Sequence, residues 1–259
     1  MRKYTSIIIF ALSSLTIFSC EKAGLRLTEY SLPTDKAFLR IALLSPNTPN
    51  VMIKSNDVKI NGAFTAGFAG IFPSIINFPD FSAVDPGTTI KLSLPNTGTQ
   101  NDSVVLFTGK IGLEAGKFYS LTLTDTGVNR TAFSIEDKFN PQVDSFTNVR
   151  LINGTVGATL NFIRVDSNNA TDFVRDTIAR NVAYKNTSGF IAVRTFTTRA
   201  FIRLRVSTTT GVALIGTAIP PQTVATGSRR SITVYSTGFI DGLIGQLIPQ
   251  LFNSTVTNQ

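Results

Sequence analysis

Short runs of alternating apolar and polar residues recur along this chain and predict strands. In Gly116–Asp125 the side chains of Tyr119, Leu121 and Leu123 share one face at a period of two, and Ile90–Leu94 alternates in the same way. Such alternation is typical of antiparallel strands with one buried face. Turn-forming residues separate the runs at short intervals, which favours immunoglobulin-like antiparallel β-sandwiches and an all-β fold.

The same reading places the strands of the first half of the chain. The expected strands are Ala37–Leu44, Val51–Lys54, Val58–Ile60, Phe72–Phe78, Ile90–Leu94, Ser103–Phe107, Gly116–Asp125 and Thr131–Ile135. Leu113, Gly116 and Tyr119 have the spacing of a tyrosine corner, in which the tyrosine hydroxyl bonds back to the turn before its strand. We therefore expect Gly116 to take a positive φ and Tyr119 to fasten this turn.

The strand pattern returns about 110 residues later and predicts two tandem domains, at 37–143 and 144–259. Arg40-Ile41 corresponds to Arg150-Leu151, and Thr126-Gly127 to Thr237-Gly238. At the same offset Arg230 of the second unit corresponds to Tyr119 of the first, so the tyrosine corner is expected in the first unit only.

The first 19 residues read as a secretory signal peptide. Arg2 and Lys3 precede the apolar run Ile7–Ser19, which suits a signal and is too short to span a bilayer. The run ends in Ile17-Phe18-Ser19-Cys20, which resembles the lipobox of bacterial lipoproteins. That resemblance implies a lipidated Cys20, a tether over 20–36 and attachment to the outer membrane, facing the periplasm or the exterior. The alternative is an ordinary signal peptide that leaves Cys20 as a free thiol.

Composition narrows the chemistry. Apolar residues make up 42% of the chain and charged residues 15%, which supports a sizeable core and argues against disorder. The chain has no His, no Trp and a single Cys, so it lacks the commonest general base and the thiolates of a zinc cluster or an internal disulfide. We expect no cofactor, no metal and no enzymatic activity. We expect a binding, adhesion or structural display module of the cell envelope. The alternatives are an extracytoplasmic glycan-binding protein and a hydrolase that uses paired carboxylates.

Positive charge gathers in the second half. Residues 144–259 hold 11 basic and 5 acidic side chains, whereas residues 37–143 hold 8 of each. Arg203 and Arg205 alternate with the apolar residues of one expected strand, and Arg194 and Arg199 lie just upstream. Arginine suits carboxylate and phosphate groups, so these four residues are a candidate face for acidic polysaccharide, lipopolysaccharide or an acidic envelope protein. The alternative is a solvated face that protects an edge strand, and nucleic acid is not an expected partner.

Two motifs of the first unit point to a family. Arg40-Ile41 running into Ser45-Pro46-Asn47-Thr48-Pro49 resembles the opening of the domain-of-unknown-function family numbered 4397, and Ala115-Gly116-Lys117-Phe118-Tyr119 is similar to one of its later strands. The resemblance implies tandem immunoglobulin-type sandwiches in a secreted lipoprotein of Bacteroidota, without a known catalytic site. In the second unit Gly154-Thr155-Val156-Gly157 replaces the Ser-Pro loop.

Three shorter segments carry further hypotheses. Asp166–Asp172 has the acidic start of a calcium loop but lacks its glycine and closing acid, so we interpret it as a solvated turn. Asp102-Ser103-Val104 and Asp176-Thr177-Ile178 resemble the O-glycosylation acceptor triplet of Bacteroidota, which makes Ser103 and Thr177 candidate acceptors. The tail 239–252 has apolar pairs every four residues and predicts a short helical turn over the end of the sandwich, or a face that docks a partner.

Overall fold

The computed structural model describes most of the chain from residue 32 onward. The described residues are 32–61, 67, 70–73, 81–96, 101–125, 129–140, 146–168, 171–194, 201–209, 222–225, 230–238 and 250–257. Residues 33–259 form one compact unit. The signal peptide with Cys20, Arg199, most of Phe72–Phe78, and residues 239–249 of the tail lie outside the described residues, as does the predicted domain boundary near 143.

The regular elements are strands, and no α-helix occurs among the described residues. The prediction of an all-β fold rich in antiparallel sheets is therefore confirmed. The strands are β1 (Ala37–Leu43), β2 (Met52–Ser55), β3 (Val58–Lys59), β4 (Ile71–Phe72), β5 (Ser82–Val84), β6 (Thr89–Pro95), β7 (Asp102–Lys110), β8 (Phe118–Thr124), β9 (Thr131–Glu136), β10 (Phe146–Asn153), β11 (Leu160–Asn168), β12 (Thr171–Val182), β13 (Asn186–Thr187), β14 (Ile191–Arg194), β15 (Phe201–Thr208), β16 (Gln222–Ala225), β17 (Arg230–Thr237) and β18 (Gln250–Thr257). Among the residues that the structure describes, no helix is long and apolar enough to cross a bilayer.

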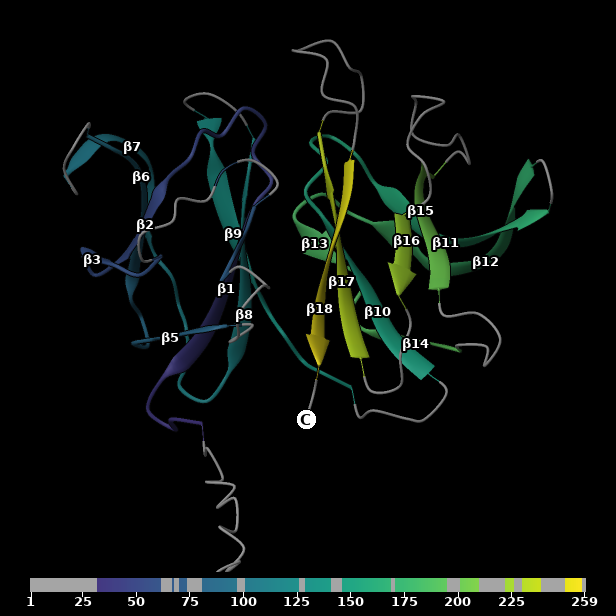
Figure 1. Ribbon diagram of the computed structural model, residues 1–259, viewed down its shortest axis with the longest axis horizontal. Coiled ribbons are helices and arrows are strands. Elements are labelled where there is room, and N and C mark those ends of the chain that lie inside the picture. The colour runs from purple at the N-terminus through teal and green to yellow at the C-terminus, as the bar shows by residue number, and fades with distance from the viewer. Residues whose placement is uncertain are drawn as a thin grey trace, which may run out of the picture. The chain divides into compact units, whose positions relative to one another are not determined.

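The same pairing scheme occurs twice (Figure 1). In the first half one sheet has the order β4-β1-β8-β9, with β5 also on β1, and a second sheet has the order β3-β2-β6-β7. In the second half the orders are β13-β10-β17-β18, with β14 on β10, and β12-β11-β15-β16. Each strand of the first half thus has its counterpart nine strands later. In both halves the central pair, β1 with β8 and β10 with β17, is parallel, while the other pairings are antiparallel.

Strand register corrects the residue correspondence inferred from sequence. Tyr119 lies opposite Leu39, the residue before Arg40, whereas Ile232 lies opposite Val149, the residue before Arg150. The second-half counterpart of Tyr119 is therefore Ile232 rather than Arg230. By the same register Thr124, not Thr126, corresponds to Thr237. The assignment from sequence was two residues out because it followed the glycine spacing, and loop lengths before β8 and β17 differ.

The tyrosine corner itself forms as expected. Gly116 has a φ of 75°, and the backbone N–H of Glu114 donates to the Tyr119 hydroxyl at 3.2 Å. The aromatic ring is buried, so a single side chain joins the turn to the core.

Each half has an apolar core shared by its two sheets. Alternate residues of β1 and β8 meet those of β2 and β6 in the first core, and β10 and β17 meet β11 and β15 in the second. β1 is buried along its whole length, which explains why its sequence is almost continuously apolar instead of alternating. Its far side contributes Ala42 and Leu44 to a third cluster, which also contains Ile152 and Tyr235 of the second half.

Candidate functional site

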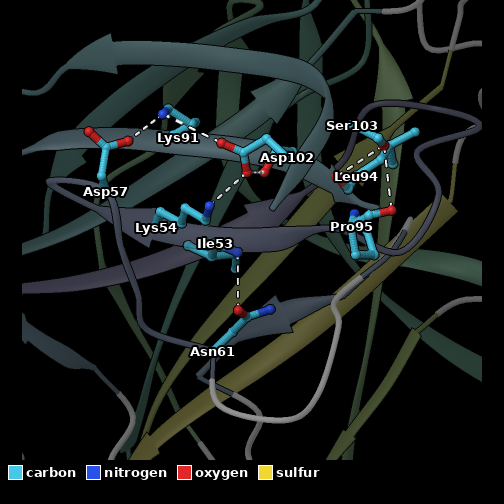
Figure 2. A network of polar contacts seen from close by, with 10 residues as sticks. Ile53, Lys54, Asp57, Asn61, Lys91, Leu94, Pro95, Asp102 and Ser103 are labelled. Atoms are coloured by element: carbon cyan, nitrogen blue, oxygen red, sulfur yellow. Dashed lines mark hydrogen bonds and ion pairs between the residues drawn. The ribbon is translucent and has the colours of Figure 1, made fainter. Parts of the chain in front are cut away.

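A network of lysines and aspartates covers one face of the sheet β3-β2-β6-β7 (Figure 2). Lys54 of β2 lies 2.9 Å from Asp102 of β7, and Lys91 of β6 lies 3.6 Å from the same carboxylate. Lys91 also forms an ion pair with Asp57 from the β2–β3 turn. The Ser93 hydroxyl donates a further hydrogen bond to Asp102. We call Lys54, Asp57, Lys91 and Asp102 the lysine–aspartate network.

Neighbouring groups in this network shift the pKa values of one aspartate and one lysine. Hydrogen bonds from Lys54 and Ser93, with the charges of Lys54 and Lys91, keep the pKa of Asp102 below its ordinary value. The hydrogen bond to Asp57 raises the pKa of Lys91. A carboxylate held ionised in this way is a poor proton donor at neutral pH, whereas a two-carboxylate hydrolase needs one acid that retains its proton. Asp102 is therefore a poor candidate for the general acid of such a pair.

Ser103, a candidate acceptor for O-glycosylation, lies next to this network. Its side chain is exposed on β7, and its hydroxyl donates to the carbonyl oxygens of Leu94 at 3.2 Å and Pro95 at 3.4 Å. β7 pairs with β6, and Val104 and Val105 beside Ser103 are about half exposed, at 50% and 48%. The triplet thus lies on an accessible strand at one end of the sheet order.

The candidate arginine face is divided between two sheets. Arg203 and Arg205 are half-buried on β15 and alternate with Leu204 and Val206, whose side chains are in the second core. This places the two arginines on the outer face of the sheet β12-β11-β15-β16. Arg194 is exposed on β14, which pairs with β10 in the other sheet of the second half. Arg194 therefore belongs to a different surface from Arg203 and Arg205.

A cavity of about 300 Å³ lies between β12 and β14. Its lining includes Thr177, the second candidate glycosylation acceptor, which is half-buried, and the exposed Arg194. Arg164 of β11 also lines it and is only 5% exposed. Arg164 is not among the site residues predicted from sequence, although a charge within the apolar run of β11 is a signal for it. The predicted solvated turn at Asp166–Asp172 falls in the β11–β12 hairpin, where Asn168 pairs with Thr171.

Buried polar groups gather at the junction of the two halves. The Arg150 guanidinium on β10 forms an ion pair with Asp137 at 2.6 Å, and their side chains are 2% and 0% exposed. Arg150 also donates to the hydroxyls of Thr233 at 2.9 Å and Ser120 at 3.1 Å, and Ser120 donates to Asp137 at 2.9 Å. Asp137 follows β9, and its backbone N–H donates to the Phe118 carbonyl. This network ties the end of the first half to the centre of the second.

Two further hydrogen bonds across the junction are reciprocal. The Thr124 hydroxyl donates to the Gly154 carbonyl at 2.9 Å, and the Thr237 hydroxyl donates to the Leu44 carbonyl. Thr124 corresponds to Thr237 by strand register, and Leu44 corresponds to Gly154. Each half thus presents the same donor and the same acceptor to the other, which is the contact pattern of a two-fold symmetric dimer interface.

Phenylalanine rings also make contacts across the junction of the two halves. Phe139, from the linker after β9, contacts Phe81 and Phe118 of the first half, and its ring centre lies 5.4 Å from that of Phe190 of the second half. The guanidinium of Arg40 lies 4.4 Å from the Phe81 ring centre, and that of Arg150 lies 4.4 Å from the Phe190 ring centre. The arginine that interrupts each apolar strand is therefore stacked on an aromatic ring in both halves.

Among the described residues no group of three or more Cys, Asp or Glu is arranged to hold a metal ion. No family model matches the chain, and no curated protein matches it significantly.

Proposed function

We propose that this protein is a non-catalytic lipoprotein of the bacterial cell envelope that binds an acidic envelope component. In this proposal lipidated Cys20 anchors it to the outer membrane, and residues 37–143 and 144–259 are two tandem immunoglobulin-like sandwich domains of the 4397 type. The repeated strand pairing and the shared core within each half support the sandwich assignment. The lipobox-like segment before the only cysteine supports the anchor.

The outward-facing arginine pair on β15 is the observation that carries the binding role. Arg203 and Arg205 lie on the side of the strand opposite the buried Leu204 and Val206. Two guanidinium groups two residues apart on one strand face can each take a carboxylate or a phosphate oxygen pair. Acidic polysaccharide and lipopolysaccharide present such groups in arrays. The charge excess of the second half would draw these polymers toward the same region.

A binding test compares salt dependence and charge removal. The mature chain, without its signal, is titrated with lipopolysaccharide and with polygalacturonate at low and high salt. We expect binding that weakens with salt, because surface charge contacts are screened. The double variant R203S/R205S should lose most of this binding. The matched control K110S/K138S removes two exposed cations from the first half and should leave it unchanged. Equal loss in both variants, or no binding to either polymer, would contradict the proposal.

The anchor has its own test. Cells that express the full chain are fed an alkyne analogue of palmitate, and the label is detected on the protein. We expect labelling of the wild type and none of C20S. Labelling that survives C20S would overturn the assignment of Cys20.

A further inference from the structure

Six buried hydroxyl groups line the junction, three on β8 and three on β17, and we call them the hydroxyl ladder. Strand register relates them as three equivalent pairs, Ser120 with Thr233, Thr122 with Tyr235, and Thr124 with Thr237. Each of these residues is at most 1% exposed. The residues between them, such as Leu121 and Val234, lie in the two apolar cores, so the ladder side chains point toward the opposite half.

The outer two pairs of the ladder have hydrogen-bond partners in the protein. Ser120 and Thr233 both accept from the Arg150 guanidinium. Thr124 and Thr237 each donate to a backbone carbonyl of the other half. These four hydroxyls therefore replace their bonds to solvent with bonds inside the folded chain.

The middle pair differs from the other two. Neither Thr122 Oγ1 nor Tyr235 Oη has a hydrogen-bond partner among the residues that the structure describes, and both side chains are fully buried. A buried hydroxyl without a partner is costly, because it has given up its bonds to water and gained none in return. Two such groups at equivalent positions indicate a shared partner that is not a protein atom.

The neighbours of Thr122 and Tyr235 place both in one buried layer. Ala42 lies directly opposite Thr122 in the parallel pair β1–β8, so their side chains share a face of the sheet. Ala42 also packs with Tyr235 and Ile152 in the third apolar cluster, and Ile152 lies opposite Tyr235 on β10. The small pair Ala42–Thr122 of the first half thus shares a layer with the large pair Ile152–Tyr235 of the second.

The chemistry of this layer selects its ligand. Threonine and tyrosine hydroxyls each donate one hydrogen bond and also accept, so a ligand that serves both must be able to do the same. The third apolar cluster around them consists of uncharged residues, and an ion placed there would lose its hydration without a counter-charge. Water is small and neutral, donates two hydrogen bonds and accepts two, and commonly bridges buried polar groups.

We propose that one internal water molecule bridges Thr122 Oγ1 and Tyr235 Oη and completes the hydroxyl ladder. The water gives each of the two hydroxyls the hydrogen bond that the protein does not supply. It is a structural component of the junction, and this inference does not depend on the proposed binding role.

Urea denaturation of the mature chain and its valine variants tests the proposal. T124V removes a hydroxyl that donates to the Gly154 carbonyl, so its effect calibrates the loss of one buried hydrogen bond. T122V makes the same change two residues away. If a water molecule binds Thr122, both variants raise the unfolding equilibrium constant by a similar factor, about fivefold. If T122V leaves that constant unchanged or lowers it while T124V raises it, the hydroxyl has no partner and the inference falls. The control T108V alters an exposed hydroxyl on β7 and should change nothing.

Tyr235 tests whether a single water molecule serves both hydroxyls. Y235F should also raise the unfolding equilibrium constant about fivefold. The double variant T122V/Y235F should raise it by less than the product of the two factors, because both changes remove bonds to the same molecule. Effects that multiply fully would mean two separate partners and would overturn the bridge.

Oxygen-17 magnetic relaxation dispersion counts long-lived internal waters directly. The double variant should hold one fewer than the wild type, and an equal number in both would contradict the proposal. Should a variant fail to fold, crystallographic density in the wild type decides the question. A water peak within hydrogen-bond distance of both oxygens supports the bridge, and a dry contact between the two side chains rules it out.

Discussion

Arg150 and Asp137 form an ion pair at 2.6 Å that is buried where the two halves of the chain meet. Removing one member of a buried pair leaves the other charge without compensation, which costs about 3–5 kcal/mol. We therefore expect D137N to lower the free energy of unfolding by about that amount, measured by urea denaturation. This is a large share of the stability of an ordinary domain.

The exposed pair Lys117–Glu114 provides the matched control. Its nitrogen–oxygen distance is 2.7 Å, similar to that of the buried pair, but its side chains are 39% and 67% exposed. E114Q makes the same carboxylate-to-amide change and should cost less than about 1 kcal/mol. A double-mutant cycle of D137N with R150M should show coupling well above that value. Similar costs for D137N and E114Q would show that burial at the junction contributes little.

Gly154 gives a second prediction, on packing between the halves. A Cβ at this position would lie 2.8 Å from Leu44 Cδ1 and 2.8 Å from the Ser236 carbonyl oxygen. Leu44 is a flexible side chain, but the Ser236 oxygen belongs to the backbone of β17, so the strand has to shift. We expect G154A to destabilise the protein by about 1–3 kcal/mol, the usual cost of overpacking, in the same urea experiment.

Gly112 is the control for that substitution. A Cβ there would meet no heavy atom within 4 Å, and its φ is not positive. G112A should leave the midpoint of unfolding unchanged or raise it slightly. A destabilisation by G112A equal to that by G154A would mean that lost glycine flexibility, and not the contact with Leu44 and Ser236, is responsible.

Acid should weaken the protein through Asp102 and Asp125. Lys54 lowers the pKa of Asp102. At Asp125 burial raises the pKa, but hydrogen bonds from Thr131 and Tyr184 and the ion pair with Lys185 outweigh it and leave the pKa lowered. A lowered native pKa stabilises the folded state above the unfolded value of about 4, and this stabilisation is lost as pH falls through the native pKa.

The measurement is the free energy of unfolding between neutral pH and pH about 2. D102N should be less stable than the wild type at neutral pH, and the difference should shrink in acid, where the wild-type carboxylate is protonated as well. A difference that is constant over the whole range would contradict the assigned pKa direction.

High pH should lower the stability of the folded protein through ionisation of Tyr184. Burial and the hydrogen bond that its hydroxyl donates to Asp125 raise the pKa of Tyr184 above its ordinary value of about 10. A raised pKa contributes stability that is complete below about pH 10 and is lost as pH rises toward the native pKa. We expect Y184F to cost stability at neutral pH and to lose stability less steeply than the wild type above pH 10. Ultraviolet titration should detect a late-ionising tyrosine in the wild type that is absent from Y184F.

The sequence predicted the strands well and the junction poorly. Ala37–Leu44, Ile90–Leu94 and Thr131–Ile135 match β1, β6 and β9 closely, because local alternation and turn residues determine such strands. β5 was missed, since three residues are too few to show a period. The continuous apolar run of β1 already indicated burial on both faces, yet nothing local identified the second half as the cover.

In the candidate site, too, local geometry was predictable from sequence, whereas contacts between distant strands were not. Alternation around Arg203 and Arg205 predicted which side of β15 they occupy, and the structure agrees with that local geometry. The grouping of Arg194 with them was an inference from proximity along the chain, and β14 belongs to a different sheet. The position of Arg164 opposite Asp176 depends on the register of β11 against β12, which shifts at three points. Register of that kind is a tertiary property that residue spacing does not encode.

Phe139 has a mechanical consequence. The proposed membrane anchor precedes β1 in the chain, while the arginine pair proposed to bind an acidic polymer lies in the second half. Because the Phe139 ring contacts Phe118 of the first half and Phe190 of the second, a force that separates the two halves has to break these aromatic contacts. The aromatic contacts of Phe139 therefore oppose mechanical separation of the two halves.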